Sequence, residues 1–539
     1  MKLLAVKKDA SYLYIVTDEG TRQQSLRWKG VRELEDKCRA LVGQEITHTT
    51  SGTWSPDKWF QDVSPVISKK ETIDIGLPFP TDLKFDKQTS LRIFGPPGTG
   101  KTDTLIREVI KAIEEGVSPS HIGYLAFTNV AADEAIERIL EVNGDEGVEG
   151  FQGFSTLHSL ATKIGGAEGG EVTTADHLNK FDPLITIRDE WMIAGEAKVA
   201  KRPDHPILNA YSYLLNTLKG DLDGGENCIS KREGDKSLPL LSKYFGLDED
   251  VIFRSFYDYA NRYWQAYLSY KKKNNLVDFN DVILNVVKDS FPDCRIPSFE
   301  LLIVDEAQDL SNLQWQFVEK LRSKAKKTIV AGDDDQAILA GFGASPERFR
   351  EFKTTDNDLT LNESHRLPKK IKQYVDDFVE ANQDGFKGHK VKKWTSNPKA
   401  KTEGEVEYQK PTKVIKNGKE VEEMVWLTTW DLINVLKKDY ENDWLVMAPT
   451  KATGTMLSDS LSNLNVPHYI HRKSCLDPGD PKKCIKIQTV HTSKGMGAKN
   501  VAYVLQSRGD WYMSQDVKLT YVAITRAKER LLMIREKLF

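Results

Sequence analysis

LRIFGPPGTGKTDTLI, residues 91–106, places a glycine-rich turn between an apolar run and an amphipathic one. The stretch fits the pattern GxxxxGK[ST] at Gly95, Gly100, Lys101 and Thr102. Glycines let backbone N–H groups wrap phosphate oxygens, the lysine adds positive charge, and the hydroxyl can ligate Mg²⁺. The sequence therefore predicts a strand, a phosphate-binding loop and a helix. The alternative is a glycine-rich turn that arose by chance.

The pattern around this turn is that of an α/β sheet. TLIREVIKAIEEG (104–116) and AADEAIERILEV (131–142) have helical spacing, and IGYLAFT (122–128) is typical of a buried strand. The strand signal fades between about 166 and 274 and resumes at FELLIVDEAQD (299–309). We therefore expect a first parallel sheet that is interrupted by a mostly helical insertion.

The second half of the chain repeats the α/β pattern. WLVMAPT (444–450), IKIQTV (485–490) and VAYVLQ (501–506) are expected to be buried strands. KVIKNGKEVEE (413–423) has two extended runs around Asn-Gly, which indicates a hairpin. Near the N-terminus, short β-rich runs and an expected helix at 31–43 indicate a small separate unit.

Composition limits the classes of protein that are compatible with this chain. It has 539 residues, 39% of them hydrophobic and 29% charged, and a net charge of −3, so binding to a polyanion must rely on local patches. Its five cysteines form no CxxC pair, which argues against a zinc site or a disulfide framework. No apolar run is long enough to cross a membrane, and charged residues interrupt the start too early for a signal peptide. We therefore expect a cytoplasmic protein.

LLIVDEAQD adds two carboxylates at the end of an apolar strand. Asp305 is expected to hold Mg²⁺ and Glu306 to polarise the attacking water. The alternative is that both acids cap the following helix.

A series of short motifs resembles superfamily-one DNA helicases of the UvrD/PcrA/Rep type. The motifs, in chain order, are AFTNVAADEAIERI, STLHSLA, LVDFNDVI, DEAQD, AGDDDQAI, LTLNESHRLP, IQTVHTSKGM and YVAITRAKERL. The resemblance covers residues 90–539 and implies two RecA-like parallel-sheet P-loop domains, with a helical insertion in the first. The residues before this range are expected to form a small N-terminal α+β accessory domain. The expected parts are an N-terminal accessory domain with linker at 1–85, a first RecA-like domain at 86–165 and 275–355, a helical insertion at 166–274, and a second RecA-like domain at 356–539 with a hairpin insertion near 404–427.

The resemblance also implies an ATP site. Gln336 would sense the γ-phosphate, and Arg366 and Arg526 would reach it from the second domain, which agrees with the need to neutralise charge on a transferred phosphoryl group. Surface salt bridges are the alternative for each arginine. The expected catalytic residues are Lys101, Asp305, Glu306, Gln336, Arg366 and Arg526. The expected ATP-binding residues are Gly95, Pro96, Pro97, Gly98, Thr99, Gly100, Lys101, Thr102, His365 and Gly495, with Thr102 and Asp305 as Mg²⁺ ligands.

The same resemblance implies a track for a nucleic-acid strand, which is held by base stacking and backbone contacts with little sequence preference. The expected DNA-binding residues are Phe127, Thr128, Asn129, His158, Phe342, Thr489, His491 and Ser493. Core packing or helix capping is the alternative for each of them. A basic stretch, GFKGHKVKKWTSNPKAK (385–401), could also form a binding surface, but a solvated charge-rich loop is the favoured interpretation.

The sequence departs from the family pattern at several positions. Leu339, Gly341 and Phe342 stand where Tyr, Trp and Arg are expected, so stacking there depends on Phe342, which could equally pack in the core. His365 replaces a tyrosine that would stack on adenine. Gly497 replaces a glutamate, which removes an expected ribose contact. A large helical insertion before TVHTSKG is also missing, which indicates a compact form.

We therefore expect an ATP-dependent single-stranded DNA translocase and DNA helicase of 3′ to 5′ polarity, with ATP and Mg²⁺ as cofactors. Its expected partners are single-stranded DNA, duplex junctions, and single-strand-binding, replication or repair proteins. The alternative is a nucleic-acid-stimulated ATPase that displaces proteins or acts on RNA without unwinding DNA.

Overall fold

The computed structural model divides the chain into two compact units, Met1–Gly76 and Leu77–Phe539. The expected helix at 31–43 lies outside the described residues. The described residues are 3–8, 12–17, 20–25, 46–51, 59–65, 83–143, 150–167, 170–173, 177, 181, 206–217, 239, 242, 249, 257–340, 343–416, 419–470, 473–475, 484–505 and 513–535.

The N-terminal unit is built from short antiparallel strands. β1 (Leu3–Lys8), β2 (Tyr12–Thr17) and β3 (Gly20–Ser25) form one sheet in that order. β4 (Ile46–Ser51) pairs with β5 (Trp59–Pro65). The β-rich character expected for this part of the chain is confirmed.

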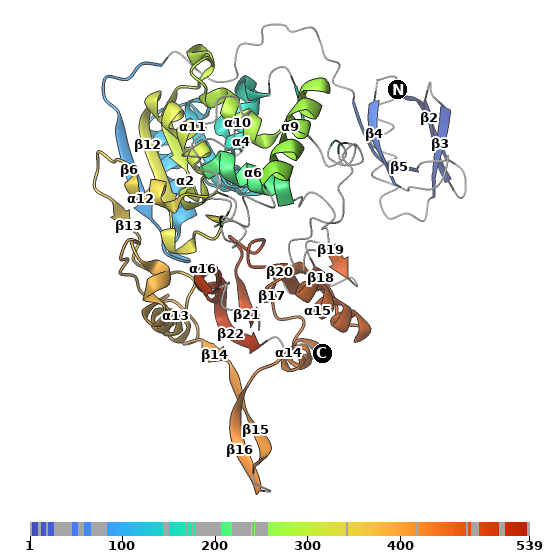
Figure 1. The fold of residues 1–539 in the computed structure, drawn as a ribbon, viewed down its shortest axis with the longest axis vertical. Coiled ribbons are helices and arrows are strands. Elements are labelled where there is room, and N and C mark those ends of the chain that lie inside the picture. The colour runs from blue at the N-terminus through green and yellow to red at the C-terminus, as the bar shows by residue number, and fades with distance from the viewer. Residues whose placement is uncertain are drawn as a thin grey trace. The chain divides into compact units, whose positions relative to one another are not determined.

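A six-stranded parallel sheet forms the centre of the first α/β domain (Figure 1), with the order β13-β6-β12-β11-β7-β8. Its strands are β6 (Thr89–Phe94), β7 (Ile122–Ala126), β8 (Phe154–Thr156), β11 (Phe299–Val304), β12 (Ala325–Gly332) and β13 (Leu359–Thr360). Because β13 joins this sheet, the first domain continues past the expected boundary at 355.

Both faces of this sheet are buried, as continuous apolar strands require. On β11, Leu302 and Val304 face one core, whereas Leu301 and Ile303 face the other. The helices α4 (Leu157–Ala161), α10 (Phe279–Val287) and α11 (Asn312–Ser323) cover the first face, and α2 (Lys101–Glu114) and α3 (Asn129–Asn143) cover the second. The short helix α12 (Pro346–Glu351) contributes Phe349 to the first core.

The described part of the expected insertion is largely helical. It contains α6 (Pro206–Thr217) and α9 (Tyr257–Lys273). A short parallel pair, β9 (Glu171–Val172) and β10 (Leu276–Val277), joins the two ends of this segment.

The second α/β domain has a seven-stranded sheet in the order β14-β22-β21-β17-β20-β18-β19, parallel except for the β18–β19 pair. The strands are β14 (Glu405–Glu407), β17 (Trp444–Ala448), β18 (His468–Ile470), β19 (Lys473–Cys475), β20 (Ile485–Thr489), β21 (Ala498–Leu505) and β22 (Ala527–Arg535). The strands expected at 444–450, 485–490 and 501–506 are confirmed.

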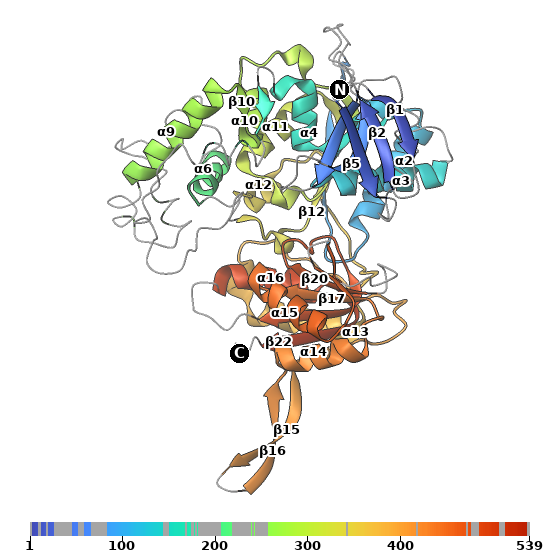
Figure 2. The ribbon, with the colours of Figure 1, turned by 90° about the vertical axis from the view of Figure 1, so that its right-hand side faces the viewer.

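Two helix pairs cover the two faces of this sheet (Figure 2). The helices α13 (Lys369–Ala381) and α16 (Met513–Ile524) pack against Leu445 and Met447 of β17. The helices α14 (Thr429–Lys438) and α15 (Lys451–Asn463) pack against Trp444 and Val446.

A hairpin follows β14 and extends from the second sheet (Figure 1). β15 (Gln409–Lys416) pairs antiparallel with β16 (Lys419–Trp426), in a register from Gln409↔Trp426 to Lys416↔Lys419. The hairpin expected around Asn-Gly is therefore confirmed. Among the helices that the structure describes, none has the length and apolar character needed to cross a membrane.

Candidate nucleotide site and strand-contacting surface

The loop between β6 and α2 has the geometry of a phosphate cradle. Gly98 and Gly100 adopt φ of 73° and 76°, a left-handed conformation that glycine adopts without strain. The backbone N–H of Gly95 donates to Gly332 O at 2.9 Å, and the Thr99 hydroxyl donates to Pro96 O at 2.8 Å. The loop is therefore fixed to the end of β12, and α2 begins at its last turn with free N–H groups.

Lys101 lies against the two carboxylates that follow β11. Its Nζ is 3.1 Å from Asp305 Oδ1 and 2.5 Å from Glu306 Oε1. Burial would lower the pKa of Lys101, but the charges of Asp305 and Glu306 outweigh burial and raise that pKa. In this arrangement both carboxylates therefore hold the Lys101 ammonium.

Glu306 occupies an unusual backbone position. Its φ of 53° is left-handed, which is rare for a residue with a side chain. Its carboxylate accepts from Gln308 Nε2 at 2.6 Å and lies 3.5 Å from Lys494 Nζ. Burial would raise the pKa of Glu306, but Lys101 and Lys494 hold it well below its ordinary value. Glu306 is therefore ionised in this arrangement.

Lys494 and Asp309 form an ion pair between the two α/β domains that we did not predict. Lys494 Nζ contacts Asp309 Oδ2, and both side chains are buried or nearly so. Burial, reinforced by Glu306, raises the pKa of Asp309 to about 6 although Lys494 opposes this shift. Both residues belong to quoted motifs, DEAQD and TSKG, but no local pattern indicates that they pair. Gly495, with φ of 80°, lies in the turn next to Lys494.

Two arginines of the second half of the chain approach the same region. Arg526 Nη2 donates to Gln336 Oε1, and Arg366 Nη1 donates to Thr525 O at 3.3 Å. Burial and then the charge of Arg366 lower the pKa of Arg526 to about 9. Because the two positive charges repel each other, an anion that binds between the guanidinium groups is stabilised. For Arg526 the surface salt-bridge alternative does not fit, because this residue is 3% exposed.

The segment 364–366 packs directly on the phosphate loop. Ser364 Oγ donates to Pro97 O at 3.0 Å, and the His365 N–H donates to Gly98 O at 2.7 Å. A Cβ added at Gly497 would lie 3.3 Å from Arg366 Nε, so the absent side chain leaves room for this guanidinium.

Thr102 and Asp305 suit a magnesium ion. Thr102 Oγ1 lies 3.4 Å from Asp305 Oδ2. A hydroxyl and a carboxylate are hard oxygen ligands, of the kind that Mg²⁺ binds together with phosphate oxygens.

The expected DNA contacts of the first domain lie at the carboxyl ends of two adjacent β-strands, β7 and β8. Phe127, Thr128 and Asn129 are exposed directly after β7. His158 follows β8, which pairs with β7. Thr128 Oγ1 also accepts from Ala131 N at 3.2 Å, so its side chain caps α3 as well.

Phe279 is an exposed aromatic residue that we did not predict at this surface. Its side chain is 59% exposed, and its ring packs edge-on against His158 at a centroid distance of 5.4 Å. The motif LVDFNDVI contains it, but sequence spacing alone does not show which face of α10 it occupies.

The expected contacts of the second domain differ from one another. Thr489 and His491 lie at or just after the end of β20, and the Thr489 hydroxyl is bonded to Thr492 at 3.1 Å. The expectation for Ser493 is wrong for its side chain, because the hydroxyl is fully buried and donates to Val490 O at 2.9 Å. Phe342 lies outside the described residues.

The favoured interpretation of the basic stretch 385–401 is also wrong in part. The side chain of Lys392 is 2% exposed, and Trp394 packs against the core of the second domain. A run of lysines in sequence resembles a solvated loop, and only the tertiary structure shows that one of them meets buried carboxylates.

Comparisons with known proteins agree with this geometry. Residues 83–357, just over half of the chain, match the model of the UvrD/REP helicase N-terminal domain. The chain is 26% identical over 308 residues to ATP-dependent DNA helicase SRS2 of Saccharomyces cerevisiae, covering 53% of this chain and 25% of that protein. It is 23% identical over 408 residues to ATP-dependent DNA helicase PcrA of Leuconostoc citreum, covering 72% of this chain and 49% of the relative.

These matches span about half the length of the curated relatives or less. The family match rests on the part of the chain that carries the phosphate loop, both carboxylates and Gln336. The chain belongs to the UvrD/REP helicase family.

Proposed function

We propose that this protein is an ATP-driven motor that moves along single-stranded DNA in the 3′ to 5′ direction and unwinds duplex DNA. The observation that carries the proposal is the meeting of groups from two α/β domains at one phosphate loop. Lys101 and Glu306 come from the first domain, and Arg366 and Arg526 come from the second.

In the proposed reaction, Glu306 accepts a proton from the attacking water. Its ionised state, held by Lys101 and Lys494, suits a base. Lys101 leaves the carboxylates and binds the phosphates, which removes one of the charges that depress the pKa of Glu306 and makes it a stronger base. Mg²⁺ held by Thr102 and Asp305 would neutralise charge on the phosphate oxygens.

The arginines would link chemistry to movement. A phosphoryl group that gains negative charge attracts both guanidinium groups, which relieves the repulsion between them. Because these arginines belong to the second domain, ATP would draw the two domains together and hydrolysis would release them.

The single-stranded DNA would lie across the carboxyl ends of β7 and β8. Phe127 and Phe279 offer exposed rings on which bases can stack, each contributing about 1–3 kcal/mol. His158 is held neutral, because burial lowers its pKa to about 4, so it would contact the strand through hydrogen bonding or ring packing and not through charge.

The test measures ATP turnover with and without single-stranded DNA. We expect turnover to rise at least about tenfold with DNA, because the strand aligns the arginines with the phosphate. Glu306→Gln should bind ATP and DNA but lose turnover. Glu300→Gln, on the same strand β11 but at its opposite end, should behave as the unaltered protein. Normal turnover in Glu306→Gln would disprove its role as the base.

Unwinding of duplexes with a 3′ or a 5′ tail tests the rest of the proposal. Preference for the 3′ tail is expected, and preference for the 5′ tail would contradict the direction. Turnover that DNA or RNA stimulates without any unwinding would favour the second candidate, an ATPase that displaces proteins or acts on RNA.

A further inference from the structure

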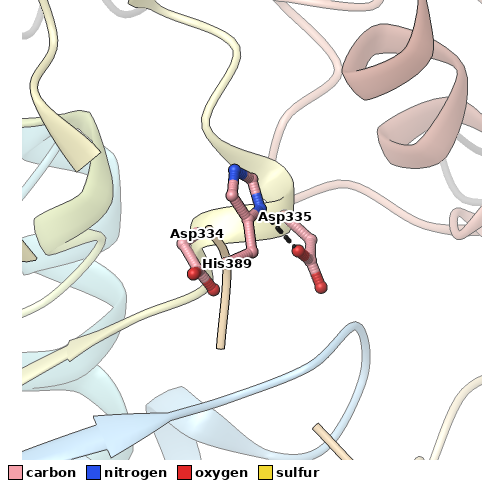
Figure 3. A group of neighbouring side chains, drawn as sticks. All are labelled: Asp334, Asp335 and His389. Atoms are coloured by element: carbon pink, nitrogen blue, oxygen red, sulfur yellow. Dashed lines mark hydrogen bonds and ion pairs between the residues drawn. The ribbon is translucent and has the colours of Figure 1, made fainter. Parts of the chain in front are cut away.

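A buried lysine holds the three aspartates that follow β12. Lys392 Nζ lies 2.6 Å from Asp333 Oδ1, 2.5 Å from Asp334 Oδ1 and 2.7 Å from Asp335 Oδ2. Figure 3 shows Asp334 and Asp335 beside His389. The atoms of these three residues that could ligate a metal lie within 4.8 Å of one another. The Lys392 ammonium already provides a cation for these carboxylates, and His389 Nδ1 pairs with Asp335 Oδ1 at 2.7 Å. We therefore do not regard the group as a metal site.

Lys392 belongs to a segment that packs with the second domain. Two residues later, Trp394 lies against the core of that domain, with Lys372 Nζ 4.2 Å from its ring centroid. At the start of the segment, the ring of Phe386 packs on Tyr521 of α16 at 5.5 Å. The aspartates, in contrast, end a strand of the first sheet. Lys392 therefore ties the second domain to the end of β12.

Asp333 connects Lys392 to Gln336. Asp333 Oδ2 accepts from Gln336 Nε2 at 2.7 Å, while Gln336 Oε1 accepts from Arg526 Nη2. A carboxylate only accepts hydrogen bonds and a guanidinium only donates them, so the amide of Gln336 has one possible orientation. Asp333 thus fixes which atom of Gln336 faces the arginine.

We propose that Lys392 is a positioning residue for ATP hydrolysis, which holds Asp333 so that Gln336 presents Oε1 to Arg526. Movement of the second domain would then reach Gln336 along two routes, through Arg526 and through Lys392 and Asp333. This inference rests on the proposed function, because it needs Gln336 to act in ATP hydrolysis.

The test compares steady-state ATP turnover, with saturating single-stranded DNA, in Lys392→Met, Gln336→Ala and the double variant. Misplacement of Gln336 should lower kcat about tenfold to a hundredfold in Lys392→Met, with the KM for ATP within about twofold. The double variant should be no slower than Gln336→Ala within about twofold, since both changes act through one side chain. Lys390→Met is the matched control, because its Nζ instead lies 3.6 Å from Asp358.

Lys392→Met leaves buried carboxylates without their ammonium, so thermal unfolding must show that it folds. If it does not, Asp333→Asn replaces it in the same cycle. An asparagine keeps one acceptor oxygen, for which Lys392 and the Asp335 N–H both compete at the place of Asp333 Oδ1. Its Nδ2 would then face Gln336 Nε2, turn the Gln336 amide over and place a donor against Arg526, so the same loss of kcat is expected.

Unchanged kcat in a folded Lys392→Met or Asp333→Asn variant would overturn the inference. Losses that multiply in the double variant would also overturn it, because they would indicate a separate structural effect. If the unaltered protein shows no DNA-stimulated turnover, or if Gln336→Ala retains full turnover, the fault lies in the proposed function, and the inference fails with it.

Discussion

His158 shows how the surroundings of one side chain set its charge. Burial lowers its pKa from 6.5 to about 4, although Asp278 opposes the shift. As the pH falls below 6.5, the unfolded chain binds a proton at this position while the folded protein does not. The stability that His158 contributes is therefore complete above pH 6.5 and is lost as the pH falls toward 4.

We predict that His158→Gln reduces the pH dependence of stability. Between pH 7.5 and 5.5, the free energy of unfolding of the unaltered protein should fall by about 1 kcal/mol more than that of the variant. Denaturant unfolding at the two pH values measures this difference, and His468, whose pKa burial also lowers, is unchanged in both proteins. Equal pH dependence in the two proteins would show that the pKa of His158 is not depressed.

The Lys271 ammonium links the end of α9 to the start of α10, and the Tyr267 hydroxyl adds a hydrogen bond to Asp278 Oδ2 at 3.2 Å. Lys271 Nζ lies 2.7 Å from Asp278 Oδ2 and 2.5 Å from Asp281 Oδ2. These two aspartates also form the capping box at the start of α10. The end of α9 is therefore fixed to the first turn of the helix that begins with the exposed Phe279.

Lys271→Met should lower the free energy of unfolding by about 3–5 kcal/mol, because it leaves two carboxylates near the protein interior without their partner. Lys272→Met, on the exposed side of the same helix end, should change it by less than about 0.5 kcal/mol. Urea unfolding of the two variants gives the comparison. If Lys271→Met lowers the free energy of unfolding by less than about 1 kcal/mol, the two carboxylates become hydrated or protonated at little cost.

The division of the chain at Gly76 leads to a prediction for the complete molecule. Because Leu77–Phe539 is a compact unit with its own cores, a chain that begins at Leu77 should fold cooperatively. Its melting temperature and its DNA-stimulated ATP turnover should stay close to those of the full chain. Calorimetry and the turnover assay measure both, and loss of the unfolding transition would show that this unit depends on residues 1–76.

The sequence predicted much of the fold because the signals are local. Continuous apolar runs mark β11 and β17, and the spacing of Gly95, Lys101 and Thr102 marks the turn between β6 and α2. The roles of the site residues stay predictions, but the structure brings Lys101, Asp305 and Glu306 together where the motifs led us to expect them.

The contacts between the two domains could not be predicted in this way. Lys494 and Asp309 are 185 residues apart, and Lys392 stands in a run that resembles a solvated loop. Whether a lysine is buried depends on carboxylates that the fold brings to it. Ser493 differs from its prediction in the same way. Its motif implied a contact with DNA, but the packing of the second domain buries its hydroxyl.

The position of β22 in the second sheet has a consequence for synthesis of the chain. This strand, Ala527–Arg535, lies between β14 and β21, although β14 is made more than a hundred residues earlier. The first sheet is complete once β13 has left the ribosome, whereas the second cannot close until Arg535 has emerged. During translation, β14 and β21 must therefore wait without the strand that lies between them, and the nascent second domain is the part of this chain most in need of protection by chaperones.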